Sequence, residues 1–395
     1  MNELTFPGRL ALQQRVLPAY RGPFFDALAS ACEGGLSVFA GHPLPEENIA
    51  VGTSLEKAHY TPARNRNFFP IRCSLYQCWQ SGIVEWLESW QPDALIVEAN
   101  PRVISNRKAI DWMHARRRIV LGWGLGTALP SRGASGLLTV WRHRQRLGLL
   151  AGLDGVIAYS QRGAQQYRQA GFPARRVFVA RNAVTTRPGK TPPSRPDTFQ
   201  GRPVVLFVGR LQARKRIDNL LHACTDLPLD LQPDLCIVGD GPARHSFEDL
   251  AQEIYPRARF LGALRGPDLE PYFQRSDLFV LPGTGGLAVQ QAMAHGLPVI
   301  VAQGDGTQED LVQLDRSGIK LSDKNSWKVL RGENGWLVRP DHRAALHQAL
   351  EEALSDVDQL RRMGVKSFQV VFQEINVEEM VRSFIHALRA LTSQV

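Results

Sequence analysis

The stretch Leu281–Val301 reads LPGTGGLAVQQAMAHGLPVIV and is the most informative part of the chain. An apolar run ends in a glycine-rich turn, a short helical segment follows, and a second apolar run closes the stretch. Gly283, Gly285 and Gly286 allow a backbone to come close to a ligand. A helix that begins near Leu287 would point its amide groups at that ligand, which favours a phosphate. The stretch predicts a buried strand, a ligand-binding turn, a helix and a second strand.

Short apolar runs alternate with helical segments on both sides of this stretch. In the first half we expect strands at residues 9–16, 36–40, 94–98, 118–122, 155–159 and 177–180. In the second half we expect them at 204–208, 235–238, 259–261, 278–281, 298–301 and 335–338. Near-continuous apolar strands joined through helices predict parallel sheets covered on both faces. The fold class is therefore α/β, with two doubly wound, Rossmann-like parallel-sheet domains.

The domain boundaries follow from length and composition. A chain of 395 residues is too long for one typical domain. Residues 184–203, VTTRPGKTPPSRPDTFQGRP, are rich in Pro, Thr and Ser and predict an interdomain linker. We expect a first domain at 1–190 and a second at 204–372. Residues 373–395 contain an amphipathic helix that we expect to pack back toward the first domain.

Composition excludes several classes of protein. The chain is 44% apolar and 22% charged, which is typical of a globular protein. No apolar run approaches the roughly 18 to 20 residues that span a bilayer, and no export signal is apparent near Met1. The cysteines form no C-x-x-C pair and no cluster with histidines, which predicts reduced thiols and a cytoplasmic protein. They are Cys32, Cys73, Cys78, Cys224 and Cys236.

Positive charge is concentrated in the first half of the chain. Residues 1–195 hold 25 Lys and Arg against 12 Asp and Glu, whereas the net charge of the whole chain is +9. A cationic first half predicts an anionic partner such as a phosphorylated substrate or a membrane surface, or it is simply a solvated basic surface. Nucleic acid is not expected, because no helix-turn-helix, zinc or aromatic stacking pattern accompanies the charge.

Two loops of the second half carry residues suited to phosphate. Gly209, Arg210 and Lys215 follow the strand at 204–208 in GRLQARKRID, and two cations past a strand end suit a diphosphate or form a solvated helix start. Gly239 and Gly241 follow the next strand in GDGP, which permits a tight reversal near a ligand or is only a turn.

These motifs together resemble the retaining nucleotide-sugar glycosyltransferases of group 1 (family 4) with the GT-B fold. In the second domain the family's order and spacing are kept by VLFVGRLQARKRIDNLLHA, LCIVGDGPARHSFEDLA, RARFLGAL, YFQRSDLFVLPG, GLAVQQAMAHGLPVIV, GTQEDLV and ENGWLVRP. In the first domain a bacterial branch that builds surface polysaccharides is resembled by LPAYRGPFF, DALIVEANPR, GWGLG and DGVIAYS. The resemblance implies two domains that face each other across a cleft.

The resemblance also implies the roles of the donor site. Arg210 and Lys215 would be catalytic by stabilising the departing diphosphate, and the turn at 284–287 would face them across it. Glu309, spaced G-x-x-E from Gly306, would lie near the nucleoside pocket or would be a solvated surface acid. The full set of expected donor-binding residues is Gly209, Gly239, Gly241, Thr284, Gly285, Gly286, Leu287, Gln291 and Glu309.

The chain departs from the family at three positions. The family usually carries two glutamates spaced E-x7-E, and Gly283 and Gln291 stand there. Gly283 cannot bond the donor sugar through a side chain, and Gln291 keeps an acceptor oxygen without the charge. Leu125 stands where the bacterial branch often has a histidine. The departures motivate an alternative, a degenerate protein that acts as a non-catalytic binding or scaffold subunit.

The first domain of such enzymes usually receives the acceptor. The strand-end candidates, each of which is otherwise a turn or solvated residue, are Tyr20, Arg21, Gly22, Asn100 and Arg102. Residues 136–150, GLLTVWRHRQRLGLL, place Trp among Arg and Leu, which is typical of a membrane interface. A core-packed helix with one wet face has the same pattern.

The sequence thus predicts a glycosyltransferase that moves a sugar from a nucleotide sugar to a glycan or lipid-linked acceptor with retention of configuration. Bacterial polysaccharide or glycolipid biosynthesis is the expected setting, in the cytoplasm or peripherally on the inner face of the membrane. We expect no cofactor and no metal ion, because no cluster of metal ligands stands out.

Overall fold

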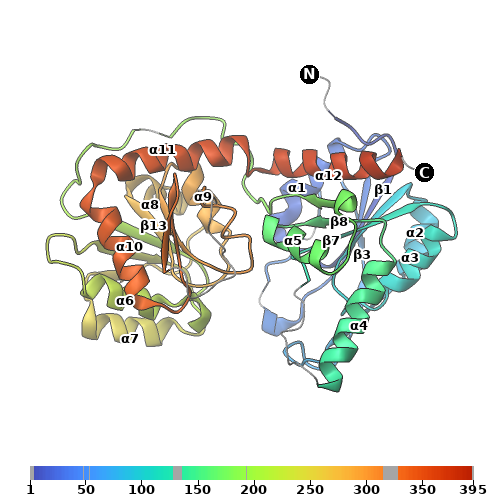
Figure 1. The fold of residues 1–395 in the computed structure, drawn as a ribbon, viewed down its shortest axis with the longest axis horizontal. Coiled ribbons are helices and arrows are strands. Elements are labelled where there is room, and N and C mark those ends of the chain that lie inside the picture. Colours follow the sequence, from blue (N-terminus) through green and yellow to red (C-terminus); the bar gives the residue numbers. More distant parts are fainter. Residues whose placement is uncertain are drawn as a thin grey trace. The chain divides into compact units, whose positions relative to one another are not determined.

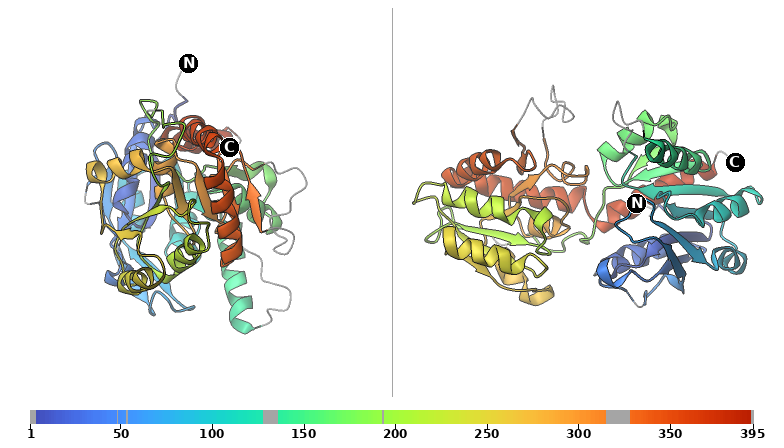
Figure 2. Two further views of the ribbon diagram at one scale, coloured as in Figure 1. Left: turned by 90° about the vertical axis from the view of Figure 1, so that its left-hand side faces the viewer. Right: turned by 90° about the horizontal axis from the view of Figure 1, so that it is seen from below.

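The computed structural model describes residues 4–47, 49–52, 54–127, 136–192, 194–314 and 328–393. The chain divides into two compact units. Unit 1 consists of residues 1–186 and 377–395, and unit 2 consists of residues 187–376. Figures 1 and 2 show a sheet in each unit with helices on both of its faces.

Unit 1 is built on a seven-stranded parallel sheet with the order β3-β2-β1-β6-β7-β8-β9. The strand order reverses between β1 and β6, so the carboxyl ends of these two strands flank a crevice of the kind in which α/β sheets bind ligands. The strands are β1 (Leu10–Val16), β2 (Leu36–Gly41), β3 (His59–Pro62), β6 (Ala94–Glu98), β7 (Ile119–Gly124), β8 (Gly155–Ala158) and β9 (Val177–Val179). A hairpin of β4 (Arg64–Phe68) and β5 (Gln77–Ser81) lies outside the sheet.

Helices cover both faces of this sheet. They are α1 (Gly22–Ser30), α2 (Ile83–Trp90), α3 (Asn106–His114), α4 (Leu137–Ala151), α5 (Gln161–Gln169) and α12 (Val377–Thr392). One face is completed from the far end of the chain, because α12 packs beside α1 (Figure 1). The ring of Phe384 on α12 lies 5.0 Å from that of Phe24 and 5.1 Å from that of Trp123, centroid to centroid.

Unit 2 repeats the architecture with the order β12-β11-β10-β13-β14-β16-β15. The strands are β10 (Val204–Val208), β11 (Asp234–Val238), β12 (Ala258–Phe260), β13 (Leu278–Leu281), β14 (Val299–Ala302), β15 (Val329–Arg331) and β16 (Gly335–Val338). The helices are α6 (Ile217–Thr225), α7 (Arg244–Ile254), α8 (Glu270–Arg275), α9 (Ala288–Ala294), α10 (Arg343–Ser355) and α11 (Val357–Gln373). The order reverses between β10 and β13, which places the second crevice after these two strands.

The α/β fold class with two parallel-sheet domains is confirmed, and the opening stretch forms the end of β13, then α9 and β14. Four strands were not predicted: β3, β4, β5 and β15. β4 reads RNRNF and exposes alternate residues, so it lacks the apolar run by which a buried strand is recognised. β15 is an antiparallel edge strand on the otherwise parallel sheet of unit 2.

Arg195 fixes the Pro-rich segment to the rest of unit 2. The guanidinium of Arg195 donates to the backbone carbonyls of Phe273, Ser276, His295 and Gly296 at 2.9–3.0 Å. Two of these carbonyls lie at the C-terminal end of α8 and two directly follow α9. One side chain therefore bonds the ends of both helices. In the described part of the chain, no helix has the length and apolar character needed to cross a membrane.

Candidate functional site

The loops after β10 and β13 meet in unit 2. The loop after β10 contains a short 3-10 helix, η4 (Ala213–Lys215), and the loop after β13 is the glycine turn of residues 283–286. Lys215 is 4% exposed, and its Nζ donates to the backbone carbonyl of Thr284 at 2.8 Å. The guanidinium of Arg214 lies 3.4 Å from the hydroxyl oxygen of Thr284. The structure therefore joins the two motifs that the sequence placed around a diphosphate.

The site formed by these two loops is positively charged and partly shielded from solvent. Burial, with the charge of Arg214 as the second cause, lowers the pKa of Lys215 from its ordinary 10.5 to about 8. Within the described ranges, neither Lys215 nor Arg214 pairs with a carboxylate, and Arg210 is half-buried immediately after β10. A buried ammonium that is held by a carbonyl is ready to receive an anionic ligand.

Gly283 is required by the close approach of the two loops. A Cβ at this position would lie 2.2 Å from the carbonyl oxygen of Arg214 and 2.6 Å from Cα of Lys215. A Cβ at Gly285, whose φ is +74°, would lie 3.4 Å from Nζ of Lys215. The glutamate of the resembled family therefore has no room at position 283, and its absence here is built into the packing.

The helix after this turn begins where the sequence predicted. Leu287 is the N-cap residue of the short helix α9, and the half-buried Gly286 precedes it. The side chain of Gln291 is exposed, whereas that of Gln290 is only 3% exposed. Gln291 therefore keeps a surface position from which its amide can reach a ligand.

The glycines of the loop after β11 serve backbone packing. A Cβ at Gly239, whose φ is +140°, would lie 1.9 Å from the carbonyl oxygen of Gly209, and one at Gly241 would lie 2.3 Å from that of Leu211. The amide of Gly209 in turn donates to the carbonyl of Val238 at 3.0 Å. Gly239 and Gly241 let the loop after β11 lie backbone to backbone with the loop after β10, which contains Arg210.

Glu309 is a buried residue, so its interpretation as a solvated surface acid was wrong. It is 2% exposed, and its carboxylate accepts a hydrogen bond from the amide of Gly306 at 2.9 Å. Gln308, which the sequence analysis missed, is also 2% exposed and donates through Nε2 to the carbonyl of Gly283 at 3.0 Å. Its Oε1 is buried without a hydrogen-bond partner among the described residues. Gln308 and Lys215 thus bond two successive carbonyls of the glycine turn.

Unit 1 has a cavity of about 310 Å³ at the carboxyl ends of β6 and β7. Asn100, Arg102 and Leu125 all line it, so the structure brings together three residues that the sequence singled out separately. Asn100 donates through Nδ2 to Oε1 of Glu98 at 3.1 Å, while Arg102 is exposed. Leu125 is 46% exposed, which leaves an apolar surface where the resembled branch has a histidine.

Arg21 does not line this cavity. It is 5% exposed, its guanidinium carbon lies 4.9 Å from the ring centre of Trp123, and it donates to Oδ1 of Asn182 at 2.5 Å. These contacts are those of a structural cation packed against an aromatic ring. Its neighbour Tyr20 is 48% exposed and Gly22 begins α1, so of the three only Tyr20 has an exposed side chain.

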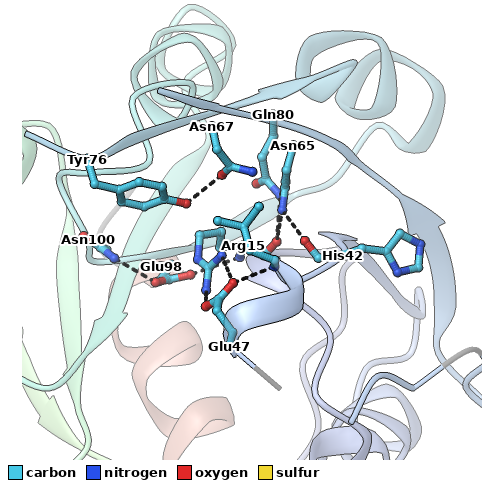
Figure 3. A network of polar contacts seen from close by, with 10 residues as sticks. Arg15, His42, Glu47, Asn65, Asn67, Tyr76, Gln80, Glu98 and Asn100 are labelled. Carbon is cyan, nitrogen blue, oxygen red and sulfur yellow. Dashed lines mark hydrogen bonds and ion pairs between the residues drawn. The ribbon is translucent and has the colours of Figure 1, made fainter. Parts of the chain in front are cut away.

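A polar network at the crevice of unit 1 was not predicted (Figure 3). The guanidinium of Arg15 on β1 pairs with the carboxylate of Glu47, and its backbone amide donates to Oε2 of Glu98 at 3.0 Å. Asn65 donates to the carbonyl of Arg15 at 2.8 Å and accepts from Gln80 at 2.9 Å. Both oxygens of Glu98 are thereby occupied, which fixes this carboxylate at the edge of the cavity.

Helix α4 differs from an ordinary core-packed helix. Leu138 is 51% exposed, Trp141 37% and Leu147 39%, whereas Leu149 and Leu150 are buried. Three large apolar side chains thus face solvent on a helix that also carries several arginines. Among the residues that the structure describes, no group of three His, Cys, Asp or Glu side chains could hold a metal ion.

Solved structures match the chain along nearly its full length. Alr3699/HepE from Anabaena, solved in complex with UDP, has a TM-score of 0.66 and 18% identity, with 97% of this chain and 99% of that chain covered. The sucrose-phosphate synthase of Thermosynechococcus elongatus has a TM-score of 0.67 and 19% identity, with 98% and 100% covered. The chain therefore has the GT-B fold, which these proteins share.

The sequence comparisons each match only a part of the chain. Residues 202–356 match the family model described as glycosyl transferases group 1. The GDP-mannose-dependent alpha-mannosyltransferase of Mycolicibacterium smegmatis is 43% identical over 125 residues, which are 31% of this chain and 31% of that protein. The chain thus matches less than half the length of the curated relatives. The range matched by the family model, residues 202–356, includes Arg210, Lys215, the glycine turn and Glu309.

Proposed function

We propose that this chain is a retaining glycosyltransferase that moves a sugar from a nucleotide-sugar donor to a glycan or lipid-linked acceptor. The observation that carries the proposal is the buried ammonium of Lys215, held 2.8 Å from the carbonyl of Thr284 on the glycine turn. A diphosphate would give this ammonium a negatively charged partner in addition to the carbonyl. The group 1 match over residues 202–356 supports a sugar transfer as the reaction.

In the proposed reaction, the oxygen of an acceptor hydroxyl bonds to the anomeric carbon of the donor sugar. The bond from that carbon to the donor's phosphate oxygen breaks, and the hydroxyl proton passes to the departing diphosphate. Both events occur on one face of the sugar, which keeps its configuration. Negative charge grows on the leaving group, where Arg210 and Lys215 stabilise the transition state more than the ground state.

The donor-binding site that we propose has no carboxylate at position 283. The backbone of residues 284–287 contacts the sugar and phosphate, Gln291 contacts the nucleoside, and the buried Glu309 holds its loop in place. Gln308 acts as a positioning residue, because it donates a hydrogen bond to the carbonyl of Gly283. Neither a cofactor nor a metal ion is part of this proposal.

Calorimetric titration with GDP-mannose, UDP-glucose and ADP-glucose tests the donor site. The first donor follows the name of the mannosyltransferase relative, and the second follows the UDP complex of the Anabaena protein. We expect one donor to bind and Lys215→Ala or Arg210→Ala to weaken it by about tenfold or more, because each removes a charge-assisted contact. Lys190→Ala, which removes an exposed lysine of unit 2, serves as the control. Binding of none of the three donors would refute the proposal.

The non-catalytic alternative is based on the departures from the family at Gly283, Gln291 and Leu125. Gly283 has a packing reason of its own, so its lack of a carboxylate does not by itself indicate a lost activity. The two functions differ in cells that carry Arg210→Ala. Loss of the glycan product supports catalysis, and an unchanged amount of product supports a scaffold.

We propose further that α4 rests on an anionic membrane surface and brings unit 1 to a lipid-linked acceptor. The exposed Leu138, Trp141 and Leu147 support this arrangement, because apolar and aromatic side chains beside arginines are favoured at the interface of lipid and water. Co-sedimentation with anionic liposomes that survives moderate salt is the expected result. Absence of co-sedimentation at low salt would exclude it.

A further inference from the structure

One face of α4 and the segment after β6 enclose an arginine-rich groove in unit 1. Two cavities of about 70 Å³ and 200 Å³ lie between them, and both are lined by Gln77, Pro101 and Gln145. The smaller one shares Pro101, Arg102 and Arg146 with the 310 Å³ cavity at the ends of β6 and β7. We call this continuous set of cavities the arginine groove.

Helical spacing explains why α4 presents these side chains together. Five residues of α4 line the groove, and their spacing of three and four residues places them on one side of the helix: Trp141, Arg142, Gln145, Arg146 and Leu149. Arg144 lies on the opposite face and lines none of the three cavities. The sequence therefore directs Arg142 and Arg146 toward the segment after β6, where Arg102 and Arg107 complete the lining.

The lining of the groove contains many more guanidinium groups than carboxylates. No carboxylate lines the two smaller cavities. The carboxylate of the third is Glu98, whose oxygens already accept from Asn100 at 3.1 Å and from the amide of Arg15 at 3.0 Å. Four guanidinium groups at one groove therefore create a positive potential that attracts an anion.

One donor of the groove is buried and unsatisfied. Nε of Arg142 is removed from solvent and has no hydrogen-bond partner among the described residues. A buried N–H that lacks a partner is costly, and in folded proteins such groups bond to water or to a ligand. Gln145 on the same face is engaged only weakly by Arg107, at 3.4 Å.

We propose that the arginine groove binds a phosphate or diphosphate group carried by the acceptor. The guanidinium fork matches phosphate oxygens in geometry as well as in charge, which an ammonium does not. The groove opens into the cavity that holds Asn100 and Leu125, so a phosphate bound between α4 and Arg102 leaves the rest of the acceptor at the crevice of the sheet. This inference rests on the proposed function only in taking unit 1 as the acceptor side.

Inorganic pyrophosphate, titrated into the full chain by calorimetry, tests the groove. The donor site also binds anions, so the measurement uses an Arg210→Ala/Lys215→Ala background, in which we expect one remaining site. Adding Arg142→Gln and Arg146→Gln should weaken that site by about tenfold or more, because two charge-assisted contacts are lost. Adding Arg144→Gln instead should leave the affinity within about twofold, because the loss of an exposed charge is small.

Two further measurements make the outcome decisive. The thermal midpoint of each variant, together with the single Arg146→Gln, separates lost binding from lost folding. Binding to neutral phosphatidylcholine vesicles, measured with and without a polyprenyl diphosphate, distinguishes the source of the phosphate. Stronger binding to the vesicles that contain the diphosphate identifies a lipid headgroup. Binding of free pyrophosphate alone identifies a soluble acceptor.

The proposal is overturned if the Arg210→Ala/Lys215→Ala background binds no pyrophosphate, or if Arg142→Gln with Arg146→Gln leaves the remaining site unchanged. Donor affinity in the variant that carries only these two groove substitutions should equal that of the unsubstituted chain. A chain that binds no nucleotide sugar and yet binds pyrophosphate through the groove would refute the proposed function while keeping this inference.

Discussion

Lys215 carries its charge at neutral pH although it is 4% exposed and, among the described residues, has a carbonyl and not a carboxylate as its partner. Its pKa of about 8, against 10.5 in the unfolded chain, means that folding disfavours the protonated form. The unfolded state therefore binds more protons between pH 8 and 10.5, and stability rises with pH through that window. Below pH 8 the full destabilisation is present. The protein keeps a residue that weakens its own fold, which is the behaviour expected of a binding residue.

Lys215→Met should consequently stabilise the protein without ligand at pH 7, by up to about 3 kcal/mol from the shift in pKa. The gain should shrink as the pH rises from 8 toward 10.5, because the ammonium of the unsubstituted chain loses its proton there. Urea unfolding at pH 7 and at pH 10 measures both effects. Lys190→Met, at an exposed lysine of the same unit, should change little. A Lys215→Met variant that is less stable at pH 7 would contradict this account.

At the scale of elements, the glycine turn and η4 are held together by backbone contacts. Gly283→Ala would place a Cβ 2.2 Å from the carbonyl oxygen of Arg214, so η4 must move. We expect a loss of about 1–3 kcal/mol in stability, as in other overpacked sites, and a clear fall in donor affinity because Lys215 moves with η4. Thermal unfolding and donor calorimetry measure the two effects.

Gly189→Ala is the matched control, because a Cβ at Gly189 meets nothing within 4 Å. The control should retain both stability and donor affinity. Equal donor affinity for Gly283→Ala and the unsubstituted chain would show that the turn tolerates a side chain, and the packing explanation for the missing glutamate would then be wrong.

The elements that were predicted are those with a local apolar signal. β10 and β13 are continuous buried runs, and their length and branched residues identified them without the structure. β4 has no such run, and the network around Arg15 joins Glu47, Asn65 and Glu98, which are far apart in sequence. The reason for Gly283 was equally hidden, because the atoms that exclude a side chain there belong to Arg214 and Lys215. The local pattern of apolar residues predicts helices and strands. The polar partners of a residue depend on the topology of the fold, which brings together residues that are far apart in sequence.

At the scale of the whole molecule, unit 1 depends on a helix from the far end of the chain. Phe384→Ala on α12 would remove a fully buried ring from between Phe24 and Trp123. We expect it to destabilise unit 1 by about 3–5 kcal/mol, as for other buried aromatic residues. Hydrogen exchange should show lower protection in unit 1 and unchanged protection in unit 2.

Arg382→Ala on the exposed side of α12 is the control for this substitution. Its partner is Glu379 one turn away, and such surface pairs contribute roughly 0.5 kcal/mol or less. Equal protection of both units in Phe384→Ala would contradict the assignment of α12 to the core of unit 1.

The position of α12 has a consequence for synthesis on the ribosome. Unit 2 is continuous in sequence, so all of its strands and helices are available once residue 376 has emerged. Unit 1 begins first but lacks α12, which lies beside α1 on one face of its sheet, until residues 377–392 follow, and Phe24 and Trp123 lack the ring of Phe384 in the meantime. The domain that is translated first is therefore the one that finishes folding last. During that interval its bare apolar face is a natural target for chaperones.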